Sequence, residues 1–258
     1  MENEASLKEL INQFATMPGY KVLVHGGGRS ATRIAAQLGI ESRMVGGRRI
    51  TDEDMLQVVT MVYGGLVNKR IVAALQAKGV NAIGLTGADM DIIRSHKREP
   101  KMVTMDDGTQ EMVDFGFVGD VDHANGQRLA SLVKAKDGIE AAAPVVAPLT
   151  HDGMGNILNT NADTMAATVA KALTEEFDVT LTYCFEKPGV MADAEDDDSV
   201  IPSINTESYA RLKADGIVSG GMIPKLDNAF DSISSGVKRV VITHFMDIQA
   251  SMGTVIEK

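Results

Sequence analysis

The sequence has 258 residues, 44% of them apolar, which suits one large α/β domain or two lobes that share a core. A net charge of −10 and the scatter of its Lys and Arg residues argue against a nucleic-acid-binding surface. No run approaches ~18 uninterrupted apolar residues, so no membrane span is expected, and a single cysteine, Cys184, fits a reducing cytoplasm.

The first part of the chain predicts three helices and a strand. Apolar residues at helical spacing over 7–14 indicate an amphipathic helix. A short strand at 21–24 runs into three consecutive glycines, and the helix that follows is predicted to end at Gly39. Thr51 is the expected N-cap of a third helix, which runs towards Lys78 with acidic residues in its first turn.

The rest of the chain continues the alternation of strands and helices. One hairpin is predicted within 101–119, around the turn Asp106-Asp107-Gly108, and a second within 149–158. The other predicted elements are strands at 81–85, 143–149, 179–184 and 239–243, and helices at 162–174 and 222–234. This alternation predicts a mostly parallel sheet covered on both faces, with ligands bound at the carboxyl ends of its strands.

The loop HGGGRSA, residues 25–31, is the first candidate site. Glycines let a backbone approach an anion closely, and the start of the following helix presents N–H groups to it. A tight turn without a ligand is the plainer alternative. The loop also fits G-x-G-x-x-A, which keeps a dinucleotide-dependent oxidoreductase open. That alternative expects an acidic residue about 20 positions further on, where residues 46–51 read GGRRIT instead.

Three further motifs place polar side chains at the starts of helices. Arg49, in VGGRRIT, suits a carboxylate held by two parallel hydrogen bonds, although a solvated loop arginine explains it equally well. Asn159 and Asp163 crowd the strand–helix junction LNTNAD. Lys225 follows two glycines in the first turn of a helix, where a cation is unfavourable unless an anion also binds there.

Taken in order, the motifs VLVHGGG, GRRIT, NK, LNTNAD, FEKPGV and GGMIPK resemble those of the N-acetyl-L-glutamate kinases. The likeness extends from about residue 7 to Gly253 and Thr254, and it is closest to the form found in Bacteroidetes. It implies the amino-acid kinase fold, a three-layer αβα sandwich with a mostly parallel sheet shared by two lobes. An acylglutamate-binding lobe is then expected at 1–175 and a nucleotide-binding lobe at 176–258.

The resemblance implies transfer of a phosphoryl group from ATP, with Mg²⁺, to the side-chain carboxylate of N-acetyl- or N-succinyl-L-glutamate, the second step of arginine biosynthesis. Lys225 matches a lysine that stabilises the transition state, and Asp163 an aspartate that organises the catalytic lysines. The matches to substrate-binding positions are Gly27, Gly28, Arg49 and Asn159. The matches to nucleotide contacts are Glu186, Lys187, Gly189, Val190, Met191, Ile217, Val218 and Ser219. The family pattern assigns no metal ligand to these residues.

One segment of the family pattern is unmatched. Family members begin with a β-strand that ends in Lys-x-Gly-Gly, whereas here Met1 is followed at once by the segment that matches the next helix. We expect a truncated gene that starts at an internal Met, and a weak or inactive kinase as written, since loss of one preorganised donor costs ~10²–10³ in turnover. The alternative is a ligand-binding protein of the same fold without catalysis. The resemblance further implies a cytoplasmic homodimer that arginine does not inhibit.

Overall fold

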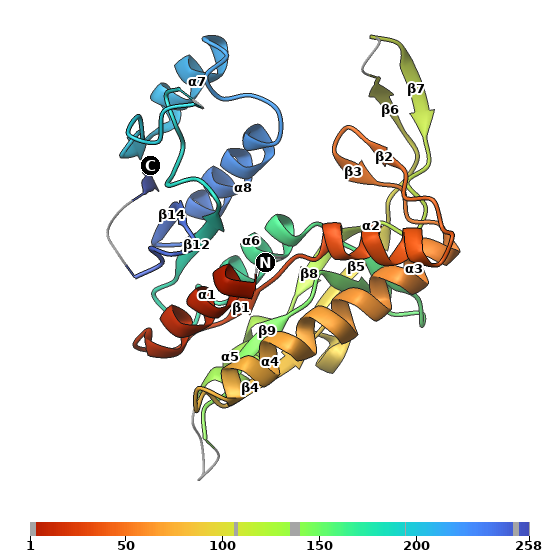
Figure 1. Cartoon of the computed structure of the whole chain (residues 1–258), viewed down its shortest axis with the longest axis horizontal. Helices are drawn as coiled ribbons and strands as arrows, with labels where there is room; N and C mark the ends of the chain where they lie inside the picture. Colours follow the sequence, from red (N-terminus) through yellow and green to blue (C-terminus); the bar gives the residue numbers. More distant parts are fainter. Residues whose placement is uncertain (1–3, 106–107, 135–139, 194, 250–252, 258) are drawn as a thin grey trace. The chain divides into compact units, whose positions relative to one another are not determined.

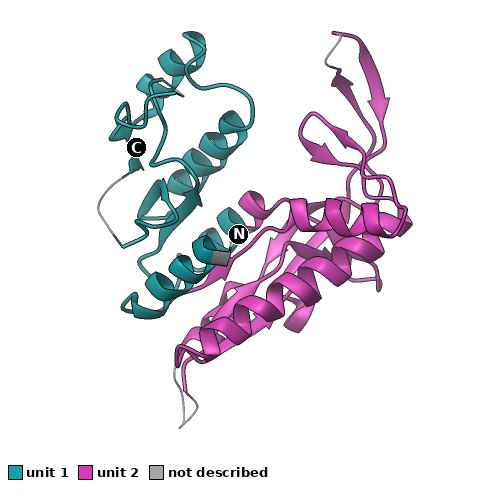
Figure 2. Cartoon of the chain, viewed as in Figure 1, with its two compact units in different colours: residues 1, 3–19, 166–258 teal, residues 2, 20–165 magenta. Residues whose placement is uncertain are grey.

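The computed structural model describes the whole chain except residues 1–3, 106–107, 135–139, 194, 250–252 and 258. The chain forms two compact units, which Figure 2 shows in different colours. Unit 1 takes in Asn3–Gly19 and Ala166–Lys258, and unit 2 takes in Tyr20–Met165. The sequence placed the boundary at residue 175 and assigned the first helix to the N-terminal lobe, so the observed division differs at both points.

The first helix, α1 (Glu4–Thr16), joins unit 1 because it packs against the far end of the chain. Its Gln13 side chain accepts a hydrogen bond from the backbone N–H of Ile248 at 3.1 Å. The side-chain amide of Gln249 donates to the Thr16 hydroxyl at 2.8 Å. Of the apolar face predicted for this helix, Ile11 and Phe14 are buried at 2% and 5% exposed, and Leu7 and Leu10 are half-buried.

Unit 2 is built on two sheets and two hairpins (Figure 1). The parallel sheet has the order β1-β9-β4, formed by Leu23–Val24, Ala143–Val146 and Ala82–Leu85. The mixed sheet has the order β11-β10-β5-β8, formed by Ile157–Asn159, Leu149–His151, Ile93–Lys97 and Gly119–Ala124. The hairpins are β2–β3 (Met44–Val45 and Arg48–Arg49) and β6–β7 (Lys101–Thr104 and Gln110–Val113). The hairpin predicted within 101–119 is β6–β7, although Asp106 and Asp107 lie outside the described residues, and the one predicted within 149–158 is the antiparallel pair β10–β11.

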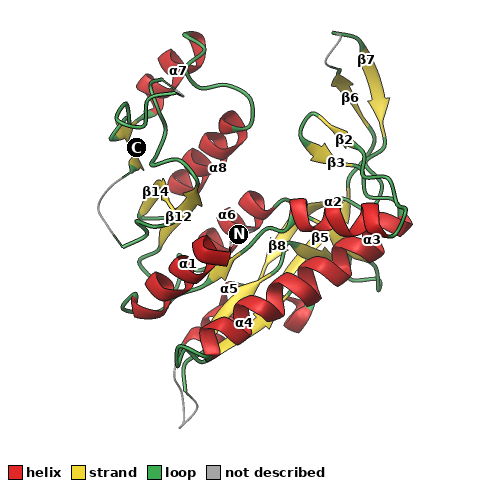
Figure 3. Ribbon diagram, viewed as in Figure 1, coloured by secondary structure: helices red, strands yellow, loops and turns green. Residues whose placement is uncertain are grey.

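A continuous helical run over Glu53–Gln76 lies along the parallel sheet of unit 2 (Figure 3). It consists of α3 (Glu53–Val59), the π-helix η1 (Thr60–Val67) and α4 (Asn68–Gln76). The run has 24 residues, and an 18-residue window within it has a mean hydropathy of 1.3, so by length and composition alone it could cross a membrane. Side chains from all three parts are buried, including Met55, Tyr63 and Leu75, so the run is the core helix of this unit.

The other helices of unit 2 are α2 (Gly28–Gln37), the short 3₁₀ helix η2 (Asp89–Asp91) and α5 (Gly126–Val133). α2 ends as predicted, with Gly39 in the left-handed region at φ 75°. The predicted N-cap of α3 was wrong by one residue. Asp52, not Thr51, caps this helix, because its side chain accepts the backbone N–H of Met55 at 2.9 Å.

Unit 1 has its own sheet, with the order β12-β14-β15-β13. These strands are Thr180–Phe185, Arg239–His244, Thr254–Ile256 and Ser203–Ile204. Besides α1, the helices are α7 (Thr206–Ala214), α8 (Met222–Ser234) and α6 (Ala162–Ala172), which belongs to unit 1 from Ala166 onward. β12 and β14 are parallel over their full lengths, so their carboxyl ends, Phe185 and His244, are paired. The α/β class is confirmed, but in the described residues the ladders form separate sheets within each unit rather than one shared sheet.

Gly116 provides a test of the packing that fixes Thr51. Its φ is 70°, and a Cβ there would overlap the carbonyl oxygen of Thr51. We expect Gly116→Ala to lower the free energy of unfolding by about 2–5 kcal/mol, since left-handed strain of ~1–2 kcal/mol adds to overpacking of ~1–3 kcal/mol. The measurement is urea denaturation followed by circular dichroism.

The matched control is Gly79→Ala. Gly79 has a φ of 76°, but no heavy atom lies within 4 Å of its added Cβ. The free energy of unfolding of this variant should fall only by the left-handed strain, about 1–2 kcal/mol. Equal losses in the two variants would show that the contact between Gly116 and Thr51 is not tight in solution.

Candidate active site

The glycine loop connects β1 to α2 and leaves no room for a side chain at its centre. Gly27 has a φ of 169°, an extended conformation that any residue adopts, so space rather than strain requires glycine. A Cβ on Gly27 would lie 2.8 Å from the ring carbon Cδ1 of Tyr63. The carbonyl of Gly27 accepts the N–H of Ala31 at 2.9 Å and starts α2. The first N–H groups of this helix have no helical acceptor, so the loop can present them to an anion.

Arg49 lies on β3 and reaches the glycine loop. Its Nη2 donates to the carbonyl of Gly28 and to the hydroxyl of Thr32, both at 2.9 Å. Its Nη1 donates to the hydroxyl of Ser42. Two of the predicted site residues, 21 positions apart in the sequence, are therefore in direct contact. The guanidinium is held at the start of α2 rather than being a solvated loop residue.

Asn159 is the last residue of β11 and only 9% exposed. Its Nδ2 donates to the hydroxyl of Thr51 at 2.9 Å. Thr51 is fully buried, and its backbone forms hydrogen bonds with the backbones of Phe115 and Phe117. Its hydroxyl therefore accepts from Asn159 instead of capping α3. The segment from Arg49 to Thr51 thus connects the glycine loop to Asn159.

The two residues expected to be catalytic begin helices in different units. Asp163 lies in the first turn of α6, within unit 2. Lys225 lies in the first turn of α8, within unit 1, and its Nζ is 4.4 Å from the ring centroid of Phe185 at the carboxyl end of β12. Lys225 is therefore at the edge of the sheet where parallel strands place their ligands.

The residues expected to contact nucleotide all lie in unit 1 but have different surroundings. Val190 and Val218 are each 2% exposed, so only their backbone groups can face a ligand. Gly189 has no space for a side chain, because a Cβ there would lie 2.8 Å from the hydroxyl of Thr254. Lys187 forms an exposed ion pair with Asp197 at 2.9 Å. The remaining four are Glu186, Ile217 and Ser219, which are exposed, and Met191, which is buried.

Sequence reasoning missed the buried polar group beneath the glycine loop. His25 is 1% exposed, and its Nδ1 lies 2.7 Å from the carbonyl of Gly26. Its Nε2 lies 3.1 Å from Nδ2 of Asn68, which also donates to the carbonyl of Val145 at 2.8 Å. Burial lowers the pKa of His25, and the hydrogen bond to Gly26 opposes this shift. His25 and Asn68 both occur in the sequence motifs, in VLVHGGG and NK, but their spacing in the sequence does not indicate that they are in contact.

A second charged cluster in unit 2 lies outside this site. Asp91 accepts from Arg94 at 2.6 Å, from Arg128 at 3.1 Å and from His151 at 2.9 Å. The hydrogen bond from Arg94 is the main reason that the pKa of Asp91 falls to about 2. Met90 and Asp91 both have φ near 52°, so the cluster holds a strained turn in place.

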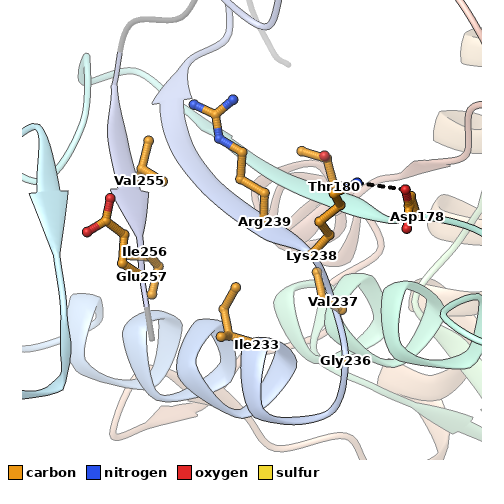
Figure 4. A pocket seen from close by; sticks show the side chains of 10 residues that line it. All are labelled: Asp178, Thr180, Ile233, Gly236, Val237, Lys238, Arg239, Val255, Ile256 and Glu257. Atoms are coloured by element: carbon orange, nitrogen blue, oxygen red, sulfur yellow. Dashed lines mark hydrogen bonds and ion pairs between the residues drawn. The ribbon is translucent and has the colours of Figure 1, made fainter.

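A cavity of about 790 Å³ in unit 1 also lies away from the predicted residues (Figure 4). It opens at the first residues of β12 and β14, Thr180 and Arg239, whereas Lys225 lies at the other end of β12. Lys238 at its rim pairs with Asp178 at 2.6 Å. No group of three metal-binding side chains occurs among the described residues.

Comparison with known proteins identifies the family of the chain. The model of the amino acid kinase family matches residues 1–244. An acetylglutamate kinase of Phocaeicola vulgatus is 60% identical over 258 residues, covering 100% of this chain and 95% of the relative. An acetylglutamate kinase of Bacteroides thetaiotaomicron is 59% identical with the same coverage. An acetylglutamate kinase of Methanopyrus kandleri is 40% identical over 91% of this chain and 90% of its own.

Solved structures support the fold. The smu.665 protein of Streptococcus mutans UA159 has a TM-score of 0.77 at 24% identity, over 99% of this chain and 93% of its own. Carbamate kinase of Giardia lamblia bound to AMP-PNP has a TM-score of 0.64 at 16% identity, and the match covers 99% of this chain and 88% of the carbamate kinase chain. With a family match over nearly its whole length and full-length relatives at about 60% identity, the chain belongs to the amino acid kinase family, among the acetylglutamate kinases.

Proposed function

We propose that this chain transfers the γ-phosphoryl group of ATP to the side-chain carboxylate of N-acetyl-L-glutamate. The observation that carries the proposal is the contact of the Arg49 guanidinium with the Gly28 carbonyl at 2.9 Å. This contact supports the proposal, because an arginine suited to a carboxylate lies beside a glycine loop suited to an anion, within one unit. The full-length relatives at 57–60% identity, all acetylglutamate kinases, support the same reaction.

Unit 2 is proposed to bind the acylated amino acid. Arg49 and Asn159 supply N–H donors for its carboxylate and carbonyl oxygens, and both are fixed by neighbouring groups. The contact between Asn159 and Thr51 couples the two donors through three consecutive residues of the chain. A substrate held in this way loses little further freedom on the way to the transition state, which is how positioning contributes to the rate.

The reaction needs little more than position and positive charge. An oxygen of the side-chain carboxylate attacks the γ-phosphorus, a new O–P bond forms, and the bond to the leaving ADP oxygen breaks. No protein base is required, because the carboxylate is already ionised at neutral pH. The N–H groups of Gly27 and Gly28 and the ammonium of Lys225 are proposed to stabilise the charge on the transferring group. Asp163 is proposed to orient the cations around it.

Unit 1 is proposed to bind the nucleotide near the start of α8. Gly220 and Gly221 precede this helix, and an added Cβ at either meets no heavy atom within 4 Å, so the backbone there is open to a ligand. Lys225 lies in the first turn, at the carboxyl end of β12. Mg²⁺ would supply further charge neutralisation. It is usually held by substrate phosphates with one or two carboxylates.

The chain is also proposed to form a homodimer in the cytoplasm. Strand β4 is at one edge of its sheet, and Ile83 on it is 38% exposed. Met61 and Leu66 on the core helix of the same unit are 54% and 43% exposed. An open edge and apolar side chains of this kind suit a second copy of the chain. Light scattering should give twice the monomer mass, and a monomer at micromolar concentration would contradict this.

The experiment that tests the activity is ADP release by the purified chain with MgATP and N-acetyl-L-glutamate. N-succinyl-L-glutamate in a parallel assay decides which acyl group is used. ADP release that requires either acceptor supports the proposal. Calorimetric binding of the acceptor without ADP release would indicate a ligand-binding protein instead, and neither binding nor release by the folded chain would refute the proposal.

Arg49→Lys tests the proposed carboxylate contact. Lysine keeps the charge but loses the planar fork of donors, so we expect KM for the acylglutamate to rise about 10- to 100-fold, with a smaller change in kcat. Arg33→Lys, an exposed position on α2, is the matched control and should leave both constants unchanged. An unchanged KM in Arg49→Lys would remove this arginine from the substrate site.

Lys225→Met tests the proposed transition-state contact. We expect kcat to fall about 10²- to 10³-fold, because one preorganised electrostatic donor is lost. Lys213→Met is the control, since Lys213 also lies over an aromatic ring, 5.8 Å from the centroid of Tyr209. Similar losses in both variants would mean that packing over the ring, rather than catalysis, explains the effect.

A further inference from the structure

His25 and Asn68 form a buried hydrogen-bonded pair directly beneath the glycine loop. Each is 1% exposed; His25 directly follows β1, and Asn68 is the first residue of α4. The imidazole lies between the Asn68 amide at Nε2 and the Gly26 carbonyl at Nδ1. Buried polar groups are costly unless their hydrogen bonds are made, and here both ring nitrogens and the Asn68 nitrogen have partners among the described residues, while the Asn68 oxygen has none.

The orientation of Asn68 fixes the tautomer of His25. The Val145 carbonyl, 2.8 Å away, can only accept, so the atom of Asn68 that faces it must be the nitrogen. The same nitrogen faces Nε2 of His25, so Nε2 must accept and carries no proton. The neutral ring therefore carries its proton on Nδ1, and this proton is donated to the Gly26 carbonyl at 2.7 Å.

The hydrogen bond to the Gly26 carbonyl also sets the direction of a neighbouring N–H. In a planar trans peptide the carbonyl and the next N–H point in opposite directions. With the Gly26 oxygen held against the imidazole, the N–H of Gly27 points away from it. Gly27 has no side chain that could fix the orientation of this peptide, because the ring of Tyr63 occupies the space that a Cβ would need. The orientation of this donor therefore depends on the tautomer of His25.

The π-helix explains how Asn68 reaches the loop. Tyr63 packs against Gly27, and Asn68 bonds His25, although five positions separate them. In an α-helix, residues three or four apart share a face. A π-helix bonds residues five apart, so the segment Thr60–Val67 brings Tyr63 and Asn68 towards the same face.

We propose that His25 and Asn68 are positioning residues: Asn68 holds His25 as the Nδ1–H tautomer, and His25 orients the Gly26–Gly27 peptide so that the Gly27 N–H serves the transferring phosphoryl group. The inference rests on the proposed kinase function for its effect on turnover. Its structural part, the tautomer, is independent of any activity.

Replacement of His25 by two residues of similar reach tests the role of the donor. In His25→Asn the amide nitrogen takes the place of Nδ1 and can still donate to Gly26, whereas His25→Leu has no donor. We expect kcat to fall about 10²-fold in His25→Leu and less than about 10-fold in His25→Asn, with KM for the acylglutamate within about threefold in both. Equal losses of kcat in the two folded variants, or a change confined to KM, would overturn the proposal.

Asn68→Asp gives a signature that a purely structural role would not produce. A carboxylate cannot donate, so it favours a proton on Nε2, and Nδ1 keeps its proton only when the ring is doubly protonated. The ratio of kcat in Asn68→Asp to kcat in wild type should therefore rise as pH falls from 8 to 6. A ratio that stays constant or falls as the pH is lowered contradicts the proposal that Asn68 acts on the loop through His25.

Six ionisable side chains lie on α2, η1, α4 and the first turn of α6, the helical elements around His25. They are Arg29 and Arg33 on α2, Tyr63 on η1, Lys69 and Arg70 on α4, and Asp163 on α6, whose Ala162 lies 3.7 Å from a Cβ built on Gly26, while β1, β4 and β9 carry none. All six are present in both the wild type and Asn68→Asp, so the ratio of their kcat values compares chains that share them. A pH-dependent ratio would therefore report the imidazole together with the carboxylate introduced beside it.

The tautomer itself can be read without turnover. Long-range ¹H–¹⁵N spectra of the wild-type chain at pH 7 should show a protonated Nδ1 and a bare Nε2 for His25. A protonated Nε2 would overturn the inference and leave the kinase proposal intact. If the wild-type chain releases no ADP, the proposed function fails, and these spectra still decide whether the pair is arranged as described.

Discussion

No side chain fits at Gly27, because the ring of Tyr63 occupies the place that a Cβ would need. This close approach keeps the loop as bare backbone and brings its N–H groups to the surface where β1 ends and α2 begins. The carbonyls of the loop, in contrast to its N–H groups, are bound by the protein itself. The Gly26 carbonyl faces His25, and the Gly28 carbonyl accepts a hydrogen bond from Arg49. With Gly27 accepting the N–H of Ala31, all three glycine carbonyls have partners that fix their directions.

The acidity of the chain makes such local positive potential necessary. A net charge of −10 repels ATP and acylglutamate at long range, so attraction must come from groups within a few ångströms. Helix starts and glycine N–H groups provide it without adding mobile side chains, and Arg49 and Lys225 add full charges. Both cations are held against other groups, a carbonyl in one case and an aromatic ring in the other, which limits their freedom before any ligand arrives.

The parts of the fold that sequence predicted well are those set by local pattern. α8 has the predicted bounds, because its apolar period and the proline in its first turn agree. Features set by distant contacts were missed. Thr51 looked like a cap, but its pairing with Gly116 left that task to Asp52. The residues of the π-helix could not be told apart from those of an α-helix by their pattern. The hydrogen bond between His25 and Asn68 was missed because it joins residues 43 positions apart.

The position of α1 has a consequence for how the chain is made. Unit 1 is discontinuous, since its first helix packs against residues 246–249 while the whole of unit 2 intervenes. At ~5–20 residues per second, the ribosome delivers the partner of α1 roughly 10–50 s after the helix itself. Unit 2, which is continuous in sequence, can complete its own core in that interval. The amphipathic face of α1 must stay exposed meanwhile, which makes this helix a natural target for chaperones that bind emerging chains.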